Sequence, residues 1–418
     1  MTEISPIKKM AFLAAALLLA AAAFVRLANL GETPLWADEM GVFWTTCFLA
    51  EKVVERKQAR VPAEQQDPPL LPLAAKLFLP GHGLPDLTPE TVAARFRFRL
   101  ASAVAGWLAV VLVLLLGWRL AGWPTALTAA AFMAFLYYGV YYSREGRPYA
   151  LIMFFACGAA VSIVALVRRP SHWWPAATLA LSLAGAVYSH YFAAFMFVVV
   201  AAWIVTFTFA PGGVDPRQRR TFVSRAVVGT LIGALLYLPW ASTFIWIIER
   251  HFDAFDLHGY HGQAPAMGMG VVSYARNLLG FWAMGKALWW PGAILAGWGL
   301  VFAWRNHRRA ALLLGPWLFA SWLVWPWLPG SGMAHSRYMI FAYPAYCLLL
   351  AFGVTGVGDR LREIVPSPWR HRLGRWVPMG LIVIVLLHSL IYLPEVLRGG
   401  VMCTGDPPQP QVCSRFIE

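Results

Sequence analysis

Long apolar runs dominate the chain and predict a helical membrane protein. They cover roughly residues 10–30, 100–117, 123–141, 149–167, 174–190, 192–210, 226–248, 287–304, 310–328, 338–357 and 376–394. Each run is near the ~20 residues that a helix needs to cross the hydrocarbon core of a bilayer. The pattern therefore predicts one all-α polytopic transmembrane domain over 1–418, with about eleven membrane-spanning helices.

The polar stretches between these runs define the parts outside the membrane. The longest covers 31–99, and its mixture of apolar and charged residues predicts interfacial helices that lie on the membrane surface. A second outer loop, 249–286, is rich in His, Gly and Asp at its start, and we expect it to be a mobile loop that gates substrate entry. A metal site at His258 and His261 is the alternative, but these residues lack a compact ligand spacing.

The last stretch, 395–418, is expected to be a tail outside the membrane. It holds Cys403 and Cys413, which flank a short Pro-rich segment. Disulfides form in oxidising compartments, so this pair is predicted to be bonded. Cys47, Cys157 and Cys347 lie in or near apolar segments, where a cysteine acts as a small buried hydrophobe.

Composition agrees with this pattern and adds an orientation. Of the 418 residues, 59% are hydrophobic and only 13% are charged, and the formal net charge is +14. Half of the 34 Lys and Arg residues fall on one side of the expected spans, which by the positive-inside rule is the cytoplasmic side. The N-terminus is therefore predicted inside and the C-terminus outside. Topology and anionic lipid headgroups explain the charge, and no zinc spacing or RNA-binding motif points to nucleic acid.

An adjacent acidic pair, Asp38 and Glu39, follows the first apolar run. Carboxylates so close to a span are costly unless they lie in water or in a polar cavity, which makes them candidates for chemistry. Other polar residues are expected at the same face of the membrane, namely Asp67, Arg144, Arg147, His190 and Arg337. Carboxylates and cations at one depth can bind a phosphorylated headgroup and activate a nucleophile beside it.

These segments resemble the GT-C superfamily of polyprenyl-phosphate-sugar-dependent glycosyltransferases, in particular the branch that contains protein O-mannosyltransferases and lipid A aminoarabinose transferases. The family's acidic pair is matched by residues 38–39, and its His-Pro-Pro-Leu motif by 67–70, where Asp67 stands in place of the His. An Arg-Leu-Pro-Ser-like entry to the second span is matched by 99–102. The Ser-Arg-Glu-x-Arg-Pro-Tyr signature is matched by 143–149, the His-Tyr pair by 190–191 and the Arg-Tyr pair by 337–338.

The resemblance implies a GT-C-like membrane enzyme that transfers a sugar from polyprenyl phosphate, with inversion, to a cell-envelope acceptor. The acceptor class is lipid A or lipopolysaccharide, another glycolipid or glycan, or protein. Asp38 is implied as the general base with Glu39 beside it. Donor phosphate would be bound by Arg144, Arg147 and Arg337, because a guanidinium fork matches two phosphate oxygens. Substrate would contact Asp67, Tyr149, His190 and Tyr338.

Several alternatives stay open at the level of sequence. If the acceptor group is itself a phosphate, no strong base is required and Asp38 would position it instead. No cofactor is required with certainty, although a divalent metal held by Asp38 and Glu39 is left open. A lipid or glycan transporter would be expected to show repeated halves, and none is found. A non-catalytic scaffold is the third class. The expected location is a bacterial inner membrane, with the active site on its periplasmic or extracellular face.

Overall fold

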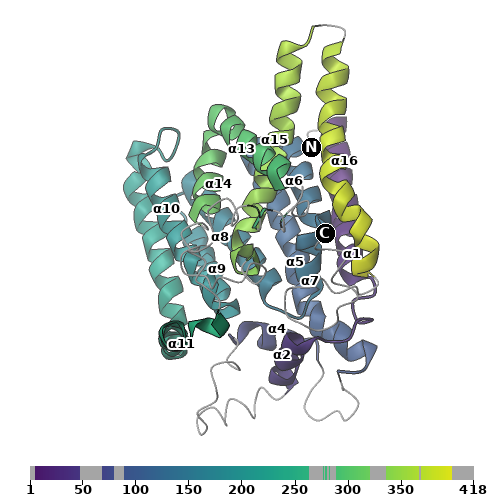
Figure 1. Ribbon diagram of the computed structural model, residues 1–418. Helices are drawn as coiled ribbons and strands as arrows, with labels where there is room; N and C mark the ends of the chain where they lie inside the picture. The colour runs from purple at the N-terminus through teal and green to yellow at the C-terminus, as the bar shows by residue number, and fades with distance from the viewer. Residues whose placement is uncertain are drawn as a thin grey trace.

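The computed structural model describes residues 5–47, 68–79, 89–262, 276, 278–279, 282, 289–320, 336–366 and 369–397. Within these residues the regular structure is helical and contains no strand, so the predicted all-α fold is confirmed. The long helices run side by side as a bundle, and two short helices, α2 (Ala37–Cys47) and α4 (Leu70–Lys76), lie across one of its ends (Figure 1). We call this the carboxylate end, because the first turn of α2 contains Asp38 and Glu39.

Helices of the N-terminal half form the first part of the bundle. They are α1 (Pro6–Leu27), α5 (Val92–Ala121), α6 (Trp123–Phe135), α7 (Tyr137–Arg144), α8 (Tyr149–Arg168) and α9 (Trp174–Ser189). Helix α5 starts at the carboxylate end, where the Thr91 side chain accepts a hydrogen bond from the amide of Ala94 and caps the first turn. Gly106 lets α5 approach α7 closely, because a Cβ at this position would clash with Ser143.

A buried arginine joins the first helix to the break between α6 and α7. Arg26 of α1 is fully buried, and its guanidinium donates to the carbonyls of Ala22, Met133 and Ala134 at 3.1 Å each. The last carbonyls of a helix have no partner within it, and Leu136 leaves the helical conformation here. Arg26 therefore satisfies the end of α6 inside the bundle.

The C-terminal half completes the bundle on both sides. Its elements are η2 (Tyr191–Ala194), α10 (Phe195–Phe209), η3 (Pro216–Gln218), α11 (Arg219–Gly262), α13 (Trp289–Asn306), α14 (Arg308–Ala320), η7 (Ser336–Ala342), α15 (Tyr343–Ile364) and α16 (Trp369–Leu397). Helix α15 packs in the core, whereas α16 exposes large apolar side chains such as Ile384 and Ile391. Exposed apolar side chains along long helices suit contact with lipid.

Six segments of the described chain are long and apolar enough to cross a membrane. They are Lys8–Leu27, Val92–Ala121, Tyr149–Arg168, Tyr191–Phe209, Pro216–Ile245 and Arg337–Ile364. The protein is thus a multi-pass membrane protein, as predicted. The other five expected spans coincide with the shorter or more polar helices α6, α9, α13, α14 and α16, so the number eleven stays a prediction.

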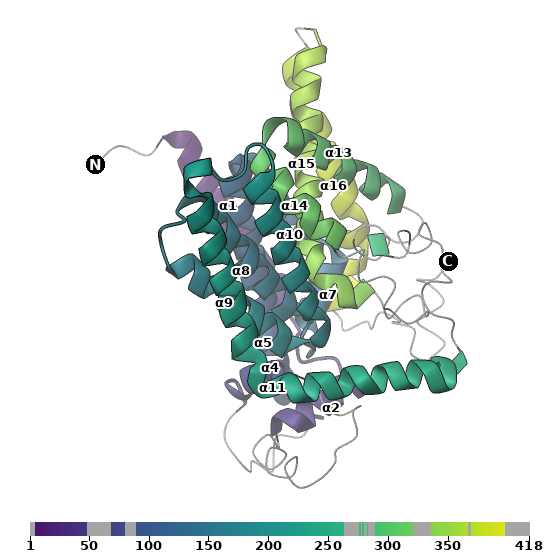
Figure 2. The same ribbon diagram turned by 90° about the vertical axis from the view of Figure 1, so that its left-hand side faces the viewer.

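Helix α11 is longer than the sequence pattern indicated. It contains Pro239, which removes a backbone donor and bends a helix. Figure 2 shows that α11 turns and that its later part runs sideways at the carboxylate end of the bundle. The expected outer loop over 249–286 therefore begins as helix up to Gly262, and its predicted gating role stays a prediction.

Candidate functional site

The site lies where the first turn of α2 meets the start of α5 and the turn between α7 and α8. Asp38 and Glu39 both fall in the first turn of α2, where the partial positive charge of a helix N-terminus favours carboxylates. Neighbouring residues on a helix do not share a face, so the two carboxylates point to different partners. The structure thereby gives the acidic pair two separate environments.

Glu39 is locked in the protein interior by Arg99 of α5. The guanidinium donates from Nε to Oε1 at 2.8 Å and from Nη2 to Oε2 at 2.6 Å, and the two side chains are 5% and 1% exposed. The amide of Gly146 donates to the same Oε1 at 2.6 Å. Both carboxylate oxygens are therefore occupied, so Glu39 fixes the geometry between α2, α5 and the turn after α7.

Arg99 also ties down the segment that connects α1 to α2. Its Nη1 donates to the carbonyls of Leu30 and Thr33 at 3.0 Å, and its Nη2 donates to the carbonyl of Pro34 at 3.1 Å. Gly146 is required opposite this pair, because a Cβ there would clash with the ring of Phe98. Arg99, at the start of the second expected span, thus holds both Glu39 and the α1–α2 connection in place.

Asp38 faces Arg147 instead. Its Oδ2 lies 3.5 Å from Nη2 of Arg147, and the side chains of Asp38 and Arg147 are 34% and 11% exposed. The Arg147 carbonyl accepts a hydrogen bond from Ser102 of α5 at 3.1 Å, which holds the turn against that helix. Asp38 is consequently the more accessible carboxylate of the acidic pair, and it stands beside a positive charge.

A row of rings connects this pair to the second arginine. The Arg147 guanidinium carbon lies 5.9 Å from the ring centre of Tyr149, and Tyr149 lies 6.0 Å from His190. The His190 ring is 5.4 Å from the ring of Tyr338, which in turn lies 5.3 Å from the Arg337 guanidinium carbon. The structure therefore brings together residues from α8, the junction between α9 and η2, and η7, which sequence analysis assigned to one face.

Besides Arg99, a second residue of the site was missing from the sequence-based set of site residues. Glu145 lies in the turn between α7 and α8, is 6% exposed, and its buried Oε2 has no hydrogen-bond partner within the described part of the chain. Burial raises the pKa of the Glu145 carboxyl to about 8, and the nearby Glu39 adds to this, while Arg147 and Arg337 oppose it. Its place inside the Ser-Arg-Glu-x-Arg-Pro-Tyr signature was the signal that could have identified it.

Arg144 is used differently from Arg147. Its Nη1 donates to the carbonyls of Val25 at 2.8 Å and Ala28 at 2.6 Å, at the C-terminal end of α1. Unpaired carbonyls at a helix end are good acceptors for a guanidinium. In this structure Arg144 joins α1 to α7, and the phosphate-binding role expected for it stays a prediction. Asp67, Cys403 and Cys413 lie outside the described residues.

The described residues do not supply a ready set of metal ligands. Among them, no group of three or more His, Cys, Asp or Glu residues is arranged to hold a metal ion. Both oxygens of Glu39 accept from Arg99, and the remaining accessible carboxylate, Asp38, already has a guanidinium beside it. A divalent ion held by Asp38 and Glu39 would have to displace these cations, so we derive no step through a metal.

Solved structures of other proteins share the fold of this chain. No family model and no curated protein sequence match the chain. The oligosaccharyltransferase AglB of Archaeoglobus fulgidus, solved with an inhibitory peptide and a dolichol-phosphate, superposes with a TM-score of 0.59 at 15% identity. That match covers 97% of this chain but only 57% of AglB, so this chain spans little more than half of the archaeal enzyme.

A second neighbour is bacterial. ArnT of Cupriavidus metallidurans bound to undecaprenyl phosphate superposes with a TM-score of 0.54 at 14% identity, and the match covers 92% of this chain and 73% of ArnT. The apo state of ArnT matches with a TM-score of 0.56 at 13% identity over 95% of this chain. Both neighbours are GT-C glycosyltransferases. The chain therefore has the membrane-embedded fold of the GT-C glycosyltransferases.

Proposed function

We propose that this protein is a membrane glycosyltransferase that moves a sugar from a polyprenyl-phosphate donor to a cell-envelope acceptor, with inversion at the anomeric carbon. The observation that carries the proposal is the Asp38–Arg147 pair, which lies at the carboxylate end and is positioned by the buried Glu39–Arg99 pair. A carboxylate beside a guanidinium, with further cations near it, provides a proton acceptor and an anion site within one small volume.

Arg147 and Arg337 are proposed to bind the phosphate that leaves. Both lie at the ends of the row of rings around His190, and both act electrostatically on the Glu145 carboxyl. The buried Nε of Arg337 has no hydrogen-bond partner within the described part of the chain. A phosphate that gains negative charge as the glycosidic bond breaks would be stabilised there by donors already in place.

Asp38 is proposed as the general base for a hydroxyl acceptor. It is the accessible member of the acidic pair, and a carboxylate in reach of the acceptor oxygen takes its proton as the new bond to C1 forms. For an acceptor that attacks through a phosphate oxygen, no proton is removed, and Asp38 would orient the acceptor.

The remaining residues are proposed to shape the substrate pocket. Tyr149, His190 and Tyr338 present ring faces between the two arginines, and flat apolar faces suit the carbon face of a sugar. The Nδ1 of His190 accepts from the amide of Phe192 at 3.2 Å, which fixes the ring and leaves Nε2 for a ligand. Asp67 is proposed to contact the acceptor from the outer loop.

The carboxylate end is proposed to face the periplasm or the cell exterior, with the protein in a bacterial inner membrane. Basic residues gather at the opposite end, where Arg119 lies in the last turn of α5 and Arg168 in the last turn of α8. Short basic segments are retained on the cytoplasmic side. The carboxylate end would then face the compartment in which sugars are transferred from lipid carriers to glycans of the cell envelope.

The experiment is mass spectrometry of envelope glycolipids and glycoproteins in cells with and without this protein. Loss of one sugar-modified species in its absence, and its return with the wild-type gene but not with Asp38→Asn, would support transfer. Glu363→Gln is the matched control, because Glu363 pairs with Arg360 on the exposed surface of α15. A transporter would instead require Arg147 and Arg337 but tolerate Asp38→Asn. If the envelope glycolipids and glycoproteins are unchanged in cells without this protein, the proposal is refuted.

A further inference from the structure

A second basic site lies at the end of the bundle opposite the carboxylate end. Arg119 and Arg168 end α5 and α8, and His307, Arg308 and Arg309 open α14. They line a cavity of about 250 Å³ whose apolar walls include Phe207. Arg119 is twenty residues beyond Arg99 on the same helix, which at about 1.5 Å per residue places this cavity ~30 Å from the Glu39–Arg99 pair.

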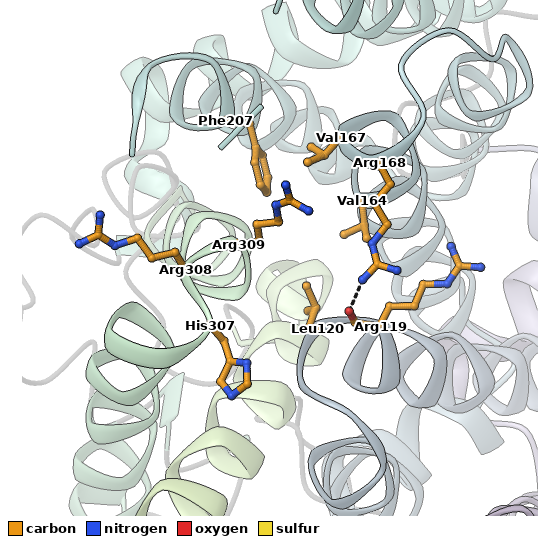
Figure 3. Close-up of a pocket in the computed structure, with 9 residues that line it drawn as sticks. All are labelled: Arg119, Leu120, Val164, Val167, Arg168, Phe207, His307, Arg308 and Arg309. Atoms are coloured by element: carbon orange, nitrogen blue, oxygen red, sulfur yellow. Dashed lines mark hydrogen bonds between the residues drawn. The ribbon is translucent and has the colours of Figure 1, made fainter. Parts of the chain in front are cut away.

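Figure 3 shows how the cations are directed. Arg168 extends toward the end of α5, where it donates to the Arg119 carbonyl, and Arg309 extends into the space between α14 and α8. Arg308 extends the other way, and its guanidinium carbon lies 4.8 Å from the ring centre of Trp304. The charges that face the cavity are therefore those of Arg168 and Arg309, with Arg119 at its rim.

A second cavity shares two of these arginines. It measures about 440 Å³ and is lined by Arg119 and Arg168 together with Arg169, Trp118 and Trp174. The two tryptophans are 45% and 48% exposed. Exposed tryptophans at the ends of membrane helices mark the level of the lipid headgroups. The two cavities thus form one basic groove at headgroup level, which we call the basic groove.

No carboxylate lines either cavity within the described part of the chain, and none of the lining arginines forms an ion pair there. The nearby Asp359 is held by Arg362 at 2.7 Å. Three or four like charges that share one groove repel each other, and an anion between them removes that repulsion. The groove has the charge and the membrane depth of a site for a phosphate tethered to acyl chains.

We propose that the basic groove binds the headgroup of an anionic phospholipid, and that its two cavities suit a headgroup with two phosphates. One phosphate would lie between Arg168 and Arg309, and the other between Arg119 and Arg169. Basic pockets between the ends of membrane helices recognise phosphate headgroups, whereas a single surface arginine only attracts them weakly. The bound lipid would bridge α5, α8 and α14, whose arginines would otherwise repel each other at this end of the bundle.

Native mass spectrometry of the purified full-length protein tests this proposal. The protein is released from detergent after incubation with cardiolipin, phosphatidylglycerol or phosphatidylcholine, and retained lipids are counted. We expect one lipid to be retained, in the order cardiolipin, phosphatidylglycerol, phosphatidylcholine. Arg168→Gln with Arg309→Gln should weaken retention on the order of tenfold or more, at ~1 kcal/mol per arginine at a headgroup. Equal retention of all three lipids would overturn the proposal.

Control variants separate a site from general charge. Arg360→Gln with Arg370→Gln removes the same charge from exposed positions of α15 and α16, outside both cavities, and should retain cardiolipin like the wild type. Should the double variant fail to fold, Arg309→Gln alone is decisive, because Arg309 donates no side-chain hydrogen bond within the described part of the chain, whereas Arg168 bonds to Arg119. Unchanged retention by Arg309→Gln would contradict the proposal.

Two competitors identify the source of the phosphate. Inorganic phosphate at millimolar concentration should not displace cardiolipin, and displacement would reassign the groove to a soluble anion. Undecaprenyl phosphate, which carries a single phosphate, should compete no better than phosphatidylglycerol. Stronger competition by undecaprenyl phosphate would overturn the assignment to phospholipid.

Discussion

Arg99 donates hydrogen bonds to both carboxylate oxygens of Glu39, at 2.6 and 2.8 Å. The two residues are sixty positions apart in sequence, and both side chains are buried. This pair splits the acidic motif into a fixed member and an accessible one. Glu39 connects α2 to α5 and, through the amide of Gly146, to the turn that carries Arg147. Asp38 thereby lies 3.5 Å from Arg147, while Glu39 makes the buried ion pair that positions α2.

Removal of one partner of this buried pair should destabilise the protein strongly. Arg99→Ala leaves the Glu39 carboxylate buried without a cation, which costs about 3–5 kcal/mol. Arg99→Met combined with Glu39→Gln removes both charges and should recover part of that loss. Thermal unfolding of the purified protein in one detergent measures the difference. Equal melting temperatures for Arg99→Ala and the wild type would show that the Glu39–Arg99 pair does not stabilise the contact between α2 and α5.

Arg147 should matter for its shape as well as for its charge. Arg147→Ala removes one donor to the leaving phosphate and should lower turnover by ~10²–10³-fold. Arg147→Lys keeps the charge but loses the planar fork, so its turnover should fall between those of Arg147→Ala and the wild type. Steady-state turnover with saturating donor is the measurement. Arg217→Lys, at the exposed start of η3, is the control and should leave turnover unchanged.

Arg144 and Arg147 should separate in the same assay. Arg144 donates to the carbonyls at the end of α1, so Arg144→Gln should lower the melting temperature of the protein. At low temperature, where the variant is still folded, Arg144→Gln should reduce turnover less than Arg147→Gln does. If Arg144 binds the donor phosphate instead, the two variants will lose turnover equally while the stability of Arg144→Gln stays near that of the wild type. The paired measurement therefore tests the role that the sequence motif suggested.

Glu145 predicts a pH dependence on the alkaline side. Its pKa is raised from the ordinary value near 4.5 to about 8, chiefly by burial, so the carboxyl is neutral at pH 7 in the folded protein. As the pH rises through about 8, the carboxyl ionises, and a negative charge appears near Arg147 and Arg337, the proposed phosphate-binding residues. The stability contributed by the neutral carboxyl is complete below the unfolded pKa near 4.5, and it is lost as the pH rises from there through the folded pKa of about 8.

Turnover should therefore fall as the pH rises through about 8, and Glu145→Gln should remove that fall while keeping turnover at pH 7. The measurement is a pH profile of turnover over pH 6 to 10 for both proteins, with Glu363→Gln as the control for an exposed carboxylate. A profile that is identical for Glu145→Gln and the wild type would show that Glu145 does not titrate in the reaction range.

Sequence patterns predicted the elements of this fold better than their ends. Apolar runs near twenty residues long have few alternatives in a membrane, because each backbone amide needs a partner inside its own helix. Helix α11 departs from the pattern, since Pro239 bends the helix without ending it and polar residues beyond 249 continue as helix. Polarity marks where a helix leaves the bilayer, not where its hydrogen bonding stops.

The motif resemblance named Asp38, Arg147 and His190 as site residues, and their roles stay predictions. The structure adds how these residues are placed: Asp38 lies beside Arg147, and His190 lies beside Tyr149. No local pattern shows that Arg99 chooses Glu39 over Asp38, because the two carboxylates are adjacent and the choice follows from which one α2 turns toward α5. The roles of Asp67 and of a Cys403–Cys413 disulfide stay predictions outside the described residues.

The most direct test of glycosyl transfer at the Asp38–Arg147 pair is release of lipid phosphate by purified protein. Wild type and Asp38→Asn are incubated with undecaprenyl-phosphate-linked mannose, glucose or aminoarabinose and with extracted envelope lipids, and free undecaprenyl phosphate is measured. The account predicts release by the wild type with one of these donors and a loss of about 10²-fold or more in Asp38→Asn, with the donor still bound. Near-normal release by Asp38→Asn would contradict it.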